Sequence, residues 1–102
     1  MSSTPQESIW TFLTNHTHVL FCLSRDPHMR MRDIALEVGI TERAVQRIVA
    51  ELRADGFLEG EREGRRVAYT IDRDRHLRHP LESGCRIGDV LAVLERATAG
   101  AP

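Results

Sequence analysis

One stretch of the chain carries most of the information about its fold. Residues 31–50 read MRDIALEVGITERAVQRIVA. Apolar side chains recur every three or four positions on both sides of Gly39, which is the spacing of one face of a helix. Gly39 supplies the left-handed conformation that ends a helix, and Thr41 is a favourable N-cap for the next one. The pattern therefore predicts two helices joined by a tight turn, the first over residues 32–38 and the second from 42 to about 54, closed by Gly56.

The small and apolar residues of this stretch meet the packing demands of a helix-turn-helix unit. Ala35 is small where the second helix must cross close to the first, and Ile40 fills the corner between them. Val45 and Ile48 anchor the second helix through one apolar face. A unit of this kind places its second helix in the major groove of DNA.

The outer face of the second predicted helix is polar and suited to reading base edges. Arg43 and Arg47 are four residues apart with Gln46 beside them, so the three side chains project together. Arginine pairs with guanine and glutamine with adenine, and a helix N-terminus favours phosphate. The alternative is a solvated face on which the arginines pair with neighbouring glutamates. The residues expected to contact DNA from this helix are Thr41, Glu42, Arg43, Gln46 and Arg47.

A β-hairpin is predicted directly after this helix. Residues 57–62 and 65–71 form two runs of strand character, with a turn at Glu63-Gly64. In the second run, apolar residues at 67, 69 and 71 alternate with polar or small ones. Arg62, Arg65 and Arg66 flank the tip and are expected to contact the DNA backbone or minor groove. The alternative is an ordinary exposed hairpin whose charges prevent edge pairing.

Amphipathic helices flank this central region. Thr4-Pro5 with Glu7 predicts a helix start, and apolar residues continue to Leu23 with a predicted break near Asn15. Residues 72–83 form a charged connector, and residues 86–97 a last helix. The fold class is therefore mainly α with a small β-hairpin, an α+β fold in one domain spanning residues 1–102.

The motifs quoted above resemble winged helix-turn-helix regulators of the MarR and ArsR type over about residues 28–71. The resemblance rests on residues 41–48, Leu52, residues 55–58, residues 63–66 and Tyr69. It implies a homodimer, a palindromic operator and repression by blocking the promoter. It also implies a small-molecule effector bound between the flanking helices and the DNA-reading unit, with Trp10, Phe12 and Phe21 as wall material. The ArsR-type metal box of closely spaced cysteines is missing from residues 32–38.

Dimerisation also has support from the residues themselves. The first and last helices hold more apolar surface than a core of three helices and one hairpin can cover, and Trp10 and Phe12 add to the surplus. We expect a homodimer through the N- and C-terminal helices, the latter at about 86–97, which would place the recognition helices about 34 Å apart. The alternative is that both helices complete the core of a monomer.

Composition narrows the remaining function classes. The net charge is −1, so a nucleic-acid partner requires the positive charge to be concentrated on one face. All 14 basic residues are arginine, which a GC-rich genome explains as well as DNA binding does. No apolar run approaches a membrane span, and we expect a cytoplasmic protein that contacts no membrane.

No cofactor, metal site or catalytic signature is predicted, so we expect no enzyme. Cys22 and Cys85 form no CxxC pair and are expected to be free, mostly buried thiols. Five histidines do not make a three-ligand site by spacing. The alternative function is a protein-interaction module in a larger complex. RNA binding lacks exposed aromatic residues for stacking, because Tyr69 falls on the predicted buried face.

Overall fold

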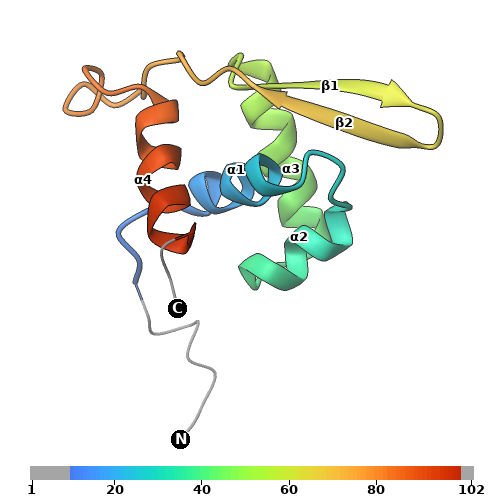
Figure 1. Ribbon diagram of the computed structural model, residues 1–102. Coiled ribbons are helices and arrows are strands. Elements are labelled where there is room, and N and C mark those ends of the chain that lie inside the picture. The colour runs from blue at the N-terminus through green and yellow to red at the C-terminus, as the bar shows by residue number, and fades with distance from the viewer. Residues whose placement is uncertain (1–9, 100–102) are drawn as a thin grey trace, which may run out of the picture.

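The computed structural model describes residues 10–99 as four helices and a two-stranded antiparallel sheet (Figure 1). The elements run in the predicted order, and the expected α+β fold class is confirmed. Their bounds are α1 Asn15–Arg25, α2 Met31–Val38, α3 Glu42–Ala54, β1 Leu58–Glu63, β2 Arg66–Ile71 and α4 Ile87–Ala99.

The turn between α2 and α3 forms as the local signals predict. Gly39 ends α2 with φ 87°, and the backbone N–H groups of Gly39 and Ile40 both donate to the carbonyl of Ala35, at 2.8 and 3.1 Å. The Thr41 hydroxyl then accepts a hydrogen bond from the backbone N–H of Ala44 at 3.0 Å and caps α3. Helix α3 covers residues 42–54 as predicted, and α2 begins one residue earlier than predicted.

The end of α3 sets the course of the hairpin. Gly56 has φ 83°, and the N–H of Phe57 donates to the Leu52 carbonyl at 2.9 Å while the N–H of Gly56 donates to the Arg53 carbonyl at 3.1 Å. This is the Schellman arrangement, which satisfies the last carbonyls of a helix. Phe57, which directly precedes β1, is buried.

The hairpin turn lies one residue later than predicted. The last paired residues are Glu63 and Arg66, so the turn is Gly64-Arg65 and not Glu63-Gly64. Gly64 has φ 64°, a conformation that glycine adopts without steric cost, and this places it inside the turn. The hairpin projects from the helices in Figure 1. The backbone N–H of Tyr69 donates to the Pro27 carbonyl at 3.0 Å and ties the hairpin to the segment after α1.

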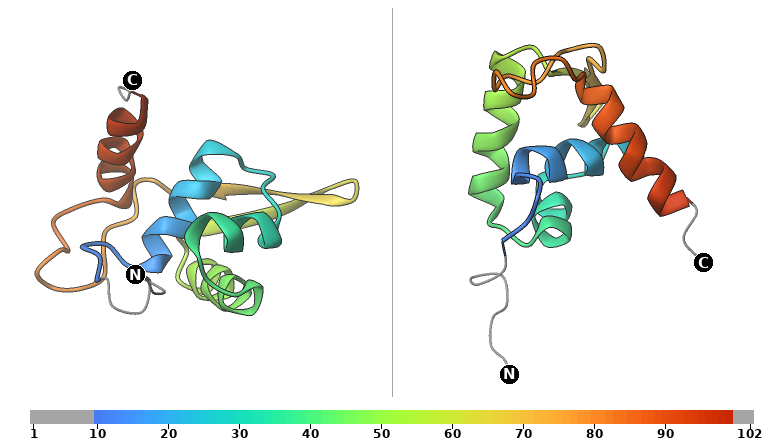
Figure 2. Two further views of the ribbon diagram at one scale, coloured as in Figure 1. Left: turned by 90° about the horizontal axis from the view of Figure 1, so that it is seen from below. Right: turned by 90° about the vertical axis from the view of Figure 1, so that its left-hand side faces the viewer.

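Helix α1 is the centre of the core. It contacts α2, α3, α4 and β2, and Figure 2 shows it between α3 and α4. Two positions fully buried at its centre are Val19 and Leu20, and α3 presents Val45 and Ile48 to them. The buried core of the described residues is Val19, Leu20, Cys22, Leu23, Ile34, Ala35, Val45, Ile48, Val49, Leu52, Phe57, Leu58, Ile87 and Leu91.

The N-terminal part differs from the sequence prediction. Helix α1 begins only at Asn15, and residues 10–14 are not helical. The predicted start at Thr4-Pro5 lies outside the described residues. Trp10 and Phe12 are 74% and 91% exposed, and their rings meet edge to face at 4.8 Å. They therefore do not belong to the core, because α1 begins only at Asn15, directly after its N-cap Thr14, and residues 10–14 are not helical.

The connector between β2 and α4 passes over one end of the helices (Figure 2). An isolated bridge joins His76 to Arg86, and the Arg73 guanidinium binds the Glu95 carboxylate of α4 through two hydrogen bonds of 2.8 and 3.3 Å. Helix α4 begins one residue later than predicted and runs two residues further. No helix in the described range 10–99 is long and apolar enough to cross a membrane.

Candidate nucleic-acid interface

Helix α3 separates its buried and exposed faces cleanly. Val45, Ile48 and Val49 are buried against α1 and α2, while the opposite face is exposed. All five residues predicted from this helix lie on or next to that exposed face: Thr41, Glu42, Arg43, Gln46 and Arg47. The 3.6-residue period of the helix brings them together, and Thr41 uses its hydroxyl for the cap.

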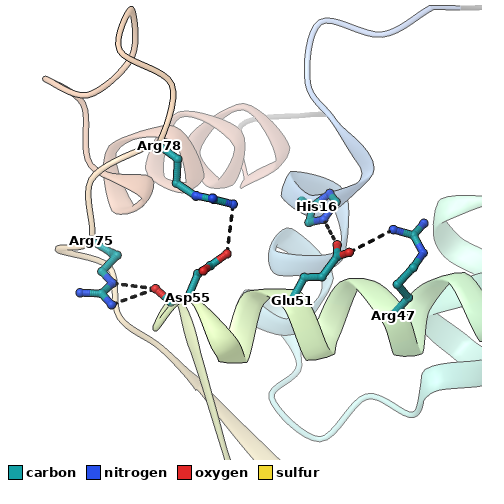
Figure 3. A network of polar contacts seen from close by, with 6 residues as sticks. All are labelled: His16, Arg47, Glu51, Asp55, Arg75 and Arg78. Carbon is teal, nitrogen blue, oxygen red and sulfur yellow. Dashed lines mark hydrogen bonds and ion pairs between the residues drawn. The ribbon is translucent and has the colours of Figure 1, made fainter.

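The two arginines of this face differ in their partners. Arg47 Nη1 lies 3.5 Å from Glu51 Oε2, and Glu51 Oε1 lies 2.7 Å from Nε2 of His16 on α1 (Figure 3). The hydrogen bond from His16, aided by the charge of Arg47, holds the pKa of Glu51 below its ordinary value. Arg43 forms no ion pair with any residue from 10 to 99. Of the pairing that the alternative of a solvated face expects, the Arg47–Glu51 pair is present, while Arg43 is exposed and unpaired within residues 10–99.

The three hairpin arginines are exposed, but the hairpin does not gather them on one face. Arg62 is opposite Val67 and Arg66 is opposite Glu63, so the two arginines point to opposite sides of the sheet. Arg65 lies in the turn. Glu63, which is opposite Arg66, has another partner: Nε2 of His28 lies 2.9 Å from Glu63 Oε1.

A groove of about 600 Å³ joins the helix-turn-helix to the hairpin. The starts of α2 and α3 form one side of it and β2 forms the other. Its charged lining consists of Arg30, Arg32, Arg65 and Arg66 with the single carboxylate Glu42, and His28 also faces it. The groove therefore unites two predicted hairpin residues with the first residue of α3.

Arg30 and Arg32 were not predicted as site residues. They flank Met31 at the start of α2, where the positive end of the helix dipole disfavours cations. Arg30 is the N-cap residue and makes no side-chain capping hydrogen bond. Within the described part of the chain neither arginine forms an ion pair. Two arginines at a position unfavourable for the helix itself are the sequence feature that would have added them to the candidate residues.

The other candidate residues lie apart from this face. Cys22 is buried, and burial raises the pKa of its thiol, whereas Cys85 is half-buried; both are free. Over residues 10–99 no three potential ligands among His, Cys, Asp and Glu come together to hold a metal.

A second hollow lies on another side of the molecule, between α1, the end of α3, the connector and the start of α4. Its volume is about 580 Å³. Of the three aromatic residues expected as wall material, Phe12 lines it, but Trp10 and Phe21 do not. Figure 3 shows a polar network beside it, in which Arg78 Nη1 forms an ion pair with Asp55 Oδ2 at 3.0 Å. The Arg75 guanidinium donates to the Asp55 carbonyl at 2.8 and 3.1 Å and caps α3.

Comparison with known proteins matches this architecture. Residues 13–59 match the family model described as winged helix-turn-helix DNA-binding. The fold is similar to the crystal structure of a predicted DNA-binding transcriptional regulator from E. coli, with a TM-score of 0.56 and 18% identity over 79% of this chain and 74% of that one. Among curated proteins none matches significantly.

A second similar structure is the PcaV transcriptional regulator from Streptomyces coelicolor, determined in complex with its natural ligand. The TM-score is 0.52 and the identity 21%, and the match covers 84% of this chain but only 60% of PcaV. These likenesses, together with the order of the elements, identify the fold as a winged helix-turn-helix, in which α2 and α3 form the helix-turn-helix and β1 and β2 form the wing.

Proposed function

We propose that this protein is a sequence-specific DNA-binding transcriptional regulator of the MarR or ArsR type, and not an enzyme. The observation that carries the proposal is the arginine-lined groove between the wing and the starts of α2 and α3, next to the exposed face of α3. A net charge of −1 does not oppose the proposal, because these arginines are concentrated on the side of the fold that would contact DNA.

The residues divide into two roles. On α3, Arg43, Gln46 and Arg47 face outward and reach base edges in the major groove, while Thr41 at the helix start lies near the DNA backbone. Glu42, the first residue of α3, fits the exocyclic amine of cytosine. The wing arginines Arg62, Arg65 and Arg66 contact phosphate or enter the adjacent minor groove.

A homodimer fits the apolar surface that the described residues leave uncovered. Trp10, Phe12 and Leu81 are strongly exposed, and Val93 of α4 is more than half exposed. These residues come from the N-terminal segment, the connector and α4, whereas the wing and α2 lie at the other side of Figure 1. Pairing through this surface would leave both α3 helices free for the two halves of a palindromic operator, and bound dimers would repress by occupying the promoter in the cytoplasm.

Light scattering tests the dimer directly. A wild-type mass of two chains, reduced to one chain in the double variant Trp10→Ser/Phe12→Ser, supports it. A wild-type monomer at the concentrations that bind DNA contradicts it. The exposed Leu36 of α2 provides a matched control, because Leu36→Ser removes an exposed apolar side chain outside the proposed dimer surface.

We also propose that a small-molecule effector acts on this regulator. The support is the hollow between the helix-turn-helix and α4, whose size is that of ligand sites in proteins. A second candidate function is a protein-interaction module. The feature that favours it is Leu36, which is 76% exposed on α2.

Fluorescence anisotropy distinguishes the DNA-binding regulator from the protein-interaction module. The protein is titrated into labelled DNA from the region upstream of its own gene and into scrambled DNA, each at two salt concentrations. Tight, salt-sensitive binding that prefers the upstream DNA supports the regulator. Equal binding to both DNAs even at low salt refutes it, and capture of a protein partner that Leu36→Ser abolishes would then support the interaction module.

A further inference from the structure

The hollow beside α4 combines an apolar wall with one polar side. Leu13 and Leu20 of the α1 region, Phe57 after α3 and Val90 of α4 provide the wall. The polar side holds His16, Glu51, Asp55, Arg78, His79 and Glu82. Mostly apolar pockets with a few convergent polar groups are the usual form of small-molecule sites.

The connector holds the His79 ring through a hydrogen bond from its own backbone. The backbone N–H of Leu81 donates to Nδ1 of His79 at 3.0 Å. Because Nδ1 is used inside the connector, this atom is not offered to a ligand.

The lining of the cavity is negatively charged. Three carboxylates, Glu51, Asp55 and Glu82, lie in the lining with the one guanidinium of Arg78. Arg78 pairs with Asp55, and Arg47 outside the lining pairs with Glu51, so the uncompensated charge is that of Glu82. Helices α1 and α4 begin at the cavity and α3 ends there, which adds only about half a positive charge in total. The cavity therefore attracts a cation and disfavours an anion.

One of the three carboxylates is available for a ligand. Glu51 binds His16 and Arg47, and Asp55 binds Arg78. The Glu82 carboxylate has no hydrogen-bond or ion-pair partner among residues 10–99; only its backbone is bonded, to the His79 carbonyl and from the Cys85 N–H.

We propose that this cavity binds a small aromatic amine, with the ammonium group paired to Glu82 and the ring packed between Leu20, Phe57 and Val90. That such a ligand is the effector rests on the proposed function. The structure adds a reason for this role, because Glu51 lines the cavity and also pairs with Arg47 on the exposed face of α3. The cavity and the DNA-facing side therefore share one carboxylate.

Trp10 provides a built-in probe for the test. It is the only tryptophan of the chain, and its ring contacts Phe12, which lines the cavity. The fluorescence of Trp10 is followed during titration of the full chain, without DNA, with three compounds of similar shape: 2-phenylethylamine, 2-phenylethanol and 3-phenylpropionate. The amine is expected to saturate with a dissociation constant about tenfold or more below that of the carboxylate, with the alcohol between them.

One variant and its control test whether the ammonium group of the ligand pairs with Glu82. Glu82→Gln is expected to weaken the amine to the affinity of the alcohol while leaving the alcohol unchanged. The matched control Glu59→Gln removes an exposed carboxylate of β1 outside the cavity lining and is expected to leave all three affinities unchanged. Tighter binding of 3-phenylpropionate, saturation by none of the three at millimolar concentration, or an unchanged amine affinity in Glu82→Gln overturns the proposal.

The two proposals fail separately in these experiments. A protein that prefers its upstream DNA but ignores the amine overturns only the ligand site. A protein that binds the amine through Glu82 but has no DNA preference retains the ligand site and loses the proposed regulatory function.

Discussion

Substitution of Arg43 by alanine is expected to weaken operator binding more than the same substitution of Arg47. Each arginine, if it reads a guanine through two hydrogen bonds, contributes about 1–3 kcal/mol of affinity, which corresponds to about 5- to 150-fold in the dissociation constant. Arg47 must first leave Glu51, 3.5 Å away, whereas Arg43 has no ion pair to break within residues 10–99. An exposed pair of this spacing is weak, so the Arg47 effect should be only about twofold smaller.

The assay is fluorescence anisotropy on the preferred DNA, extended to a double-mutant cycle. Glu51→Gln alone is expected to tighten binding about twofold, because it releases Arg47 from its pair. In the Glu51→Gln background, Arg47→Ala should cost as much as Arg43→Ala does in the wild type. The reasoning is refuted if Arg43→Ala binds like the wild type, or if Arg47→Ala costs the same with and without Glu51.

Three other predictions test the wing, the core and the contact between Glu51 and His16. Arg65→Gln should weaken binding to all DNA sequences similarly and lower the slope of log affinity against log salt by about 0.9, and an unchanged slope would show that Arg65 contacts no phosphate. Ile48→Ala should lower the free energy of unfolding by about 2–5 kcal/mol in urea, since Ile48 is fully buried, and a loss below about 1 kcal/mol would mean that α3 is not packed as described. The pKa of Glu51 is lowered in the folded state, so its bond to His16 stabilises the fold above the ordinary carboxylate pKa, and this stabilisation is lost as pH falls through the lower folded pKa. The urea midpoint should therefore decline less on acidification in Glu51→Gln than in the wild type. Parallel declines in the two proteins would contradict this.

Much of the architecture was predictable because its determinants are local. Gly39 and Gly56 adopt the left-handed conformations that end their helices, and the Thr41 cap forms as expected. The start and end of α3 agree with the prediction, because cap residues and the helical period act within a few positions. The exposed face of α3 follows from the same period, which brings Arg43, Gln46 and Arg47 together on one side.

The errors arose where local signals were weak. The turn of the hairpin moved by one residue, because the conformation of Gly64 decided it and not the charge pattern around it. The first helix was expected to include residues 10–14, which are not helical, and Trp10 and Phe12 are exposed there. Periodicity alone does not reveal whether a partner surface exists to cover an aromatic side chain.

The sequence by itself determined which segments form the helix-turn-helix and the wing, and which side of α3 faces outward. Only the tertiary structure decided that Arg30 and Arg32 share a groove with the wing, that Glu51 joins His16 to Arg47, and that the connector closes a cavity with Glu82 on its wall. The physical reason is separation along the chain. Caps, turns and periods depend on neighbours a few residues away, whereas grooves, shared carboxylates and cavities depend on how distant elements pack around α1.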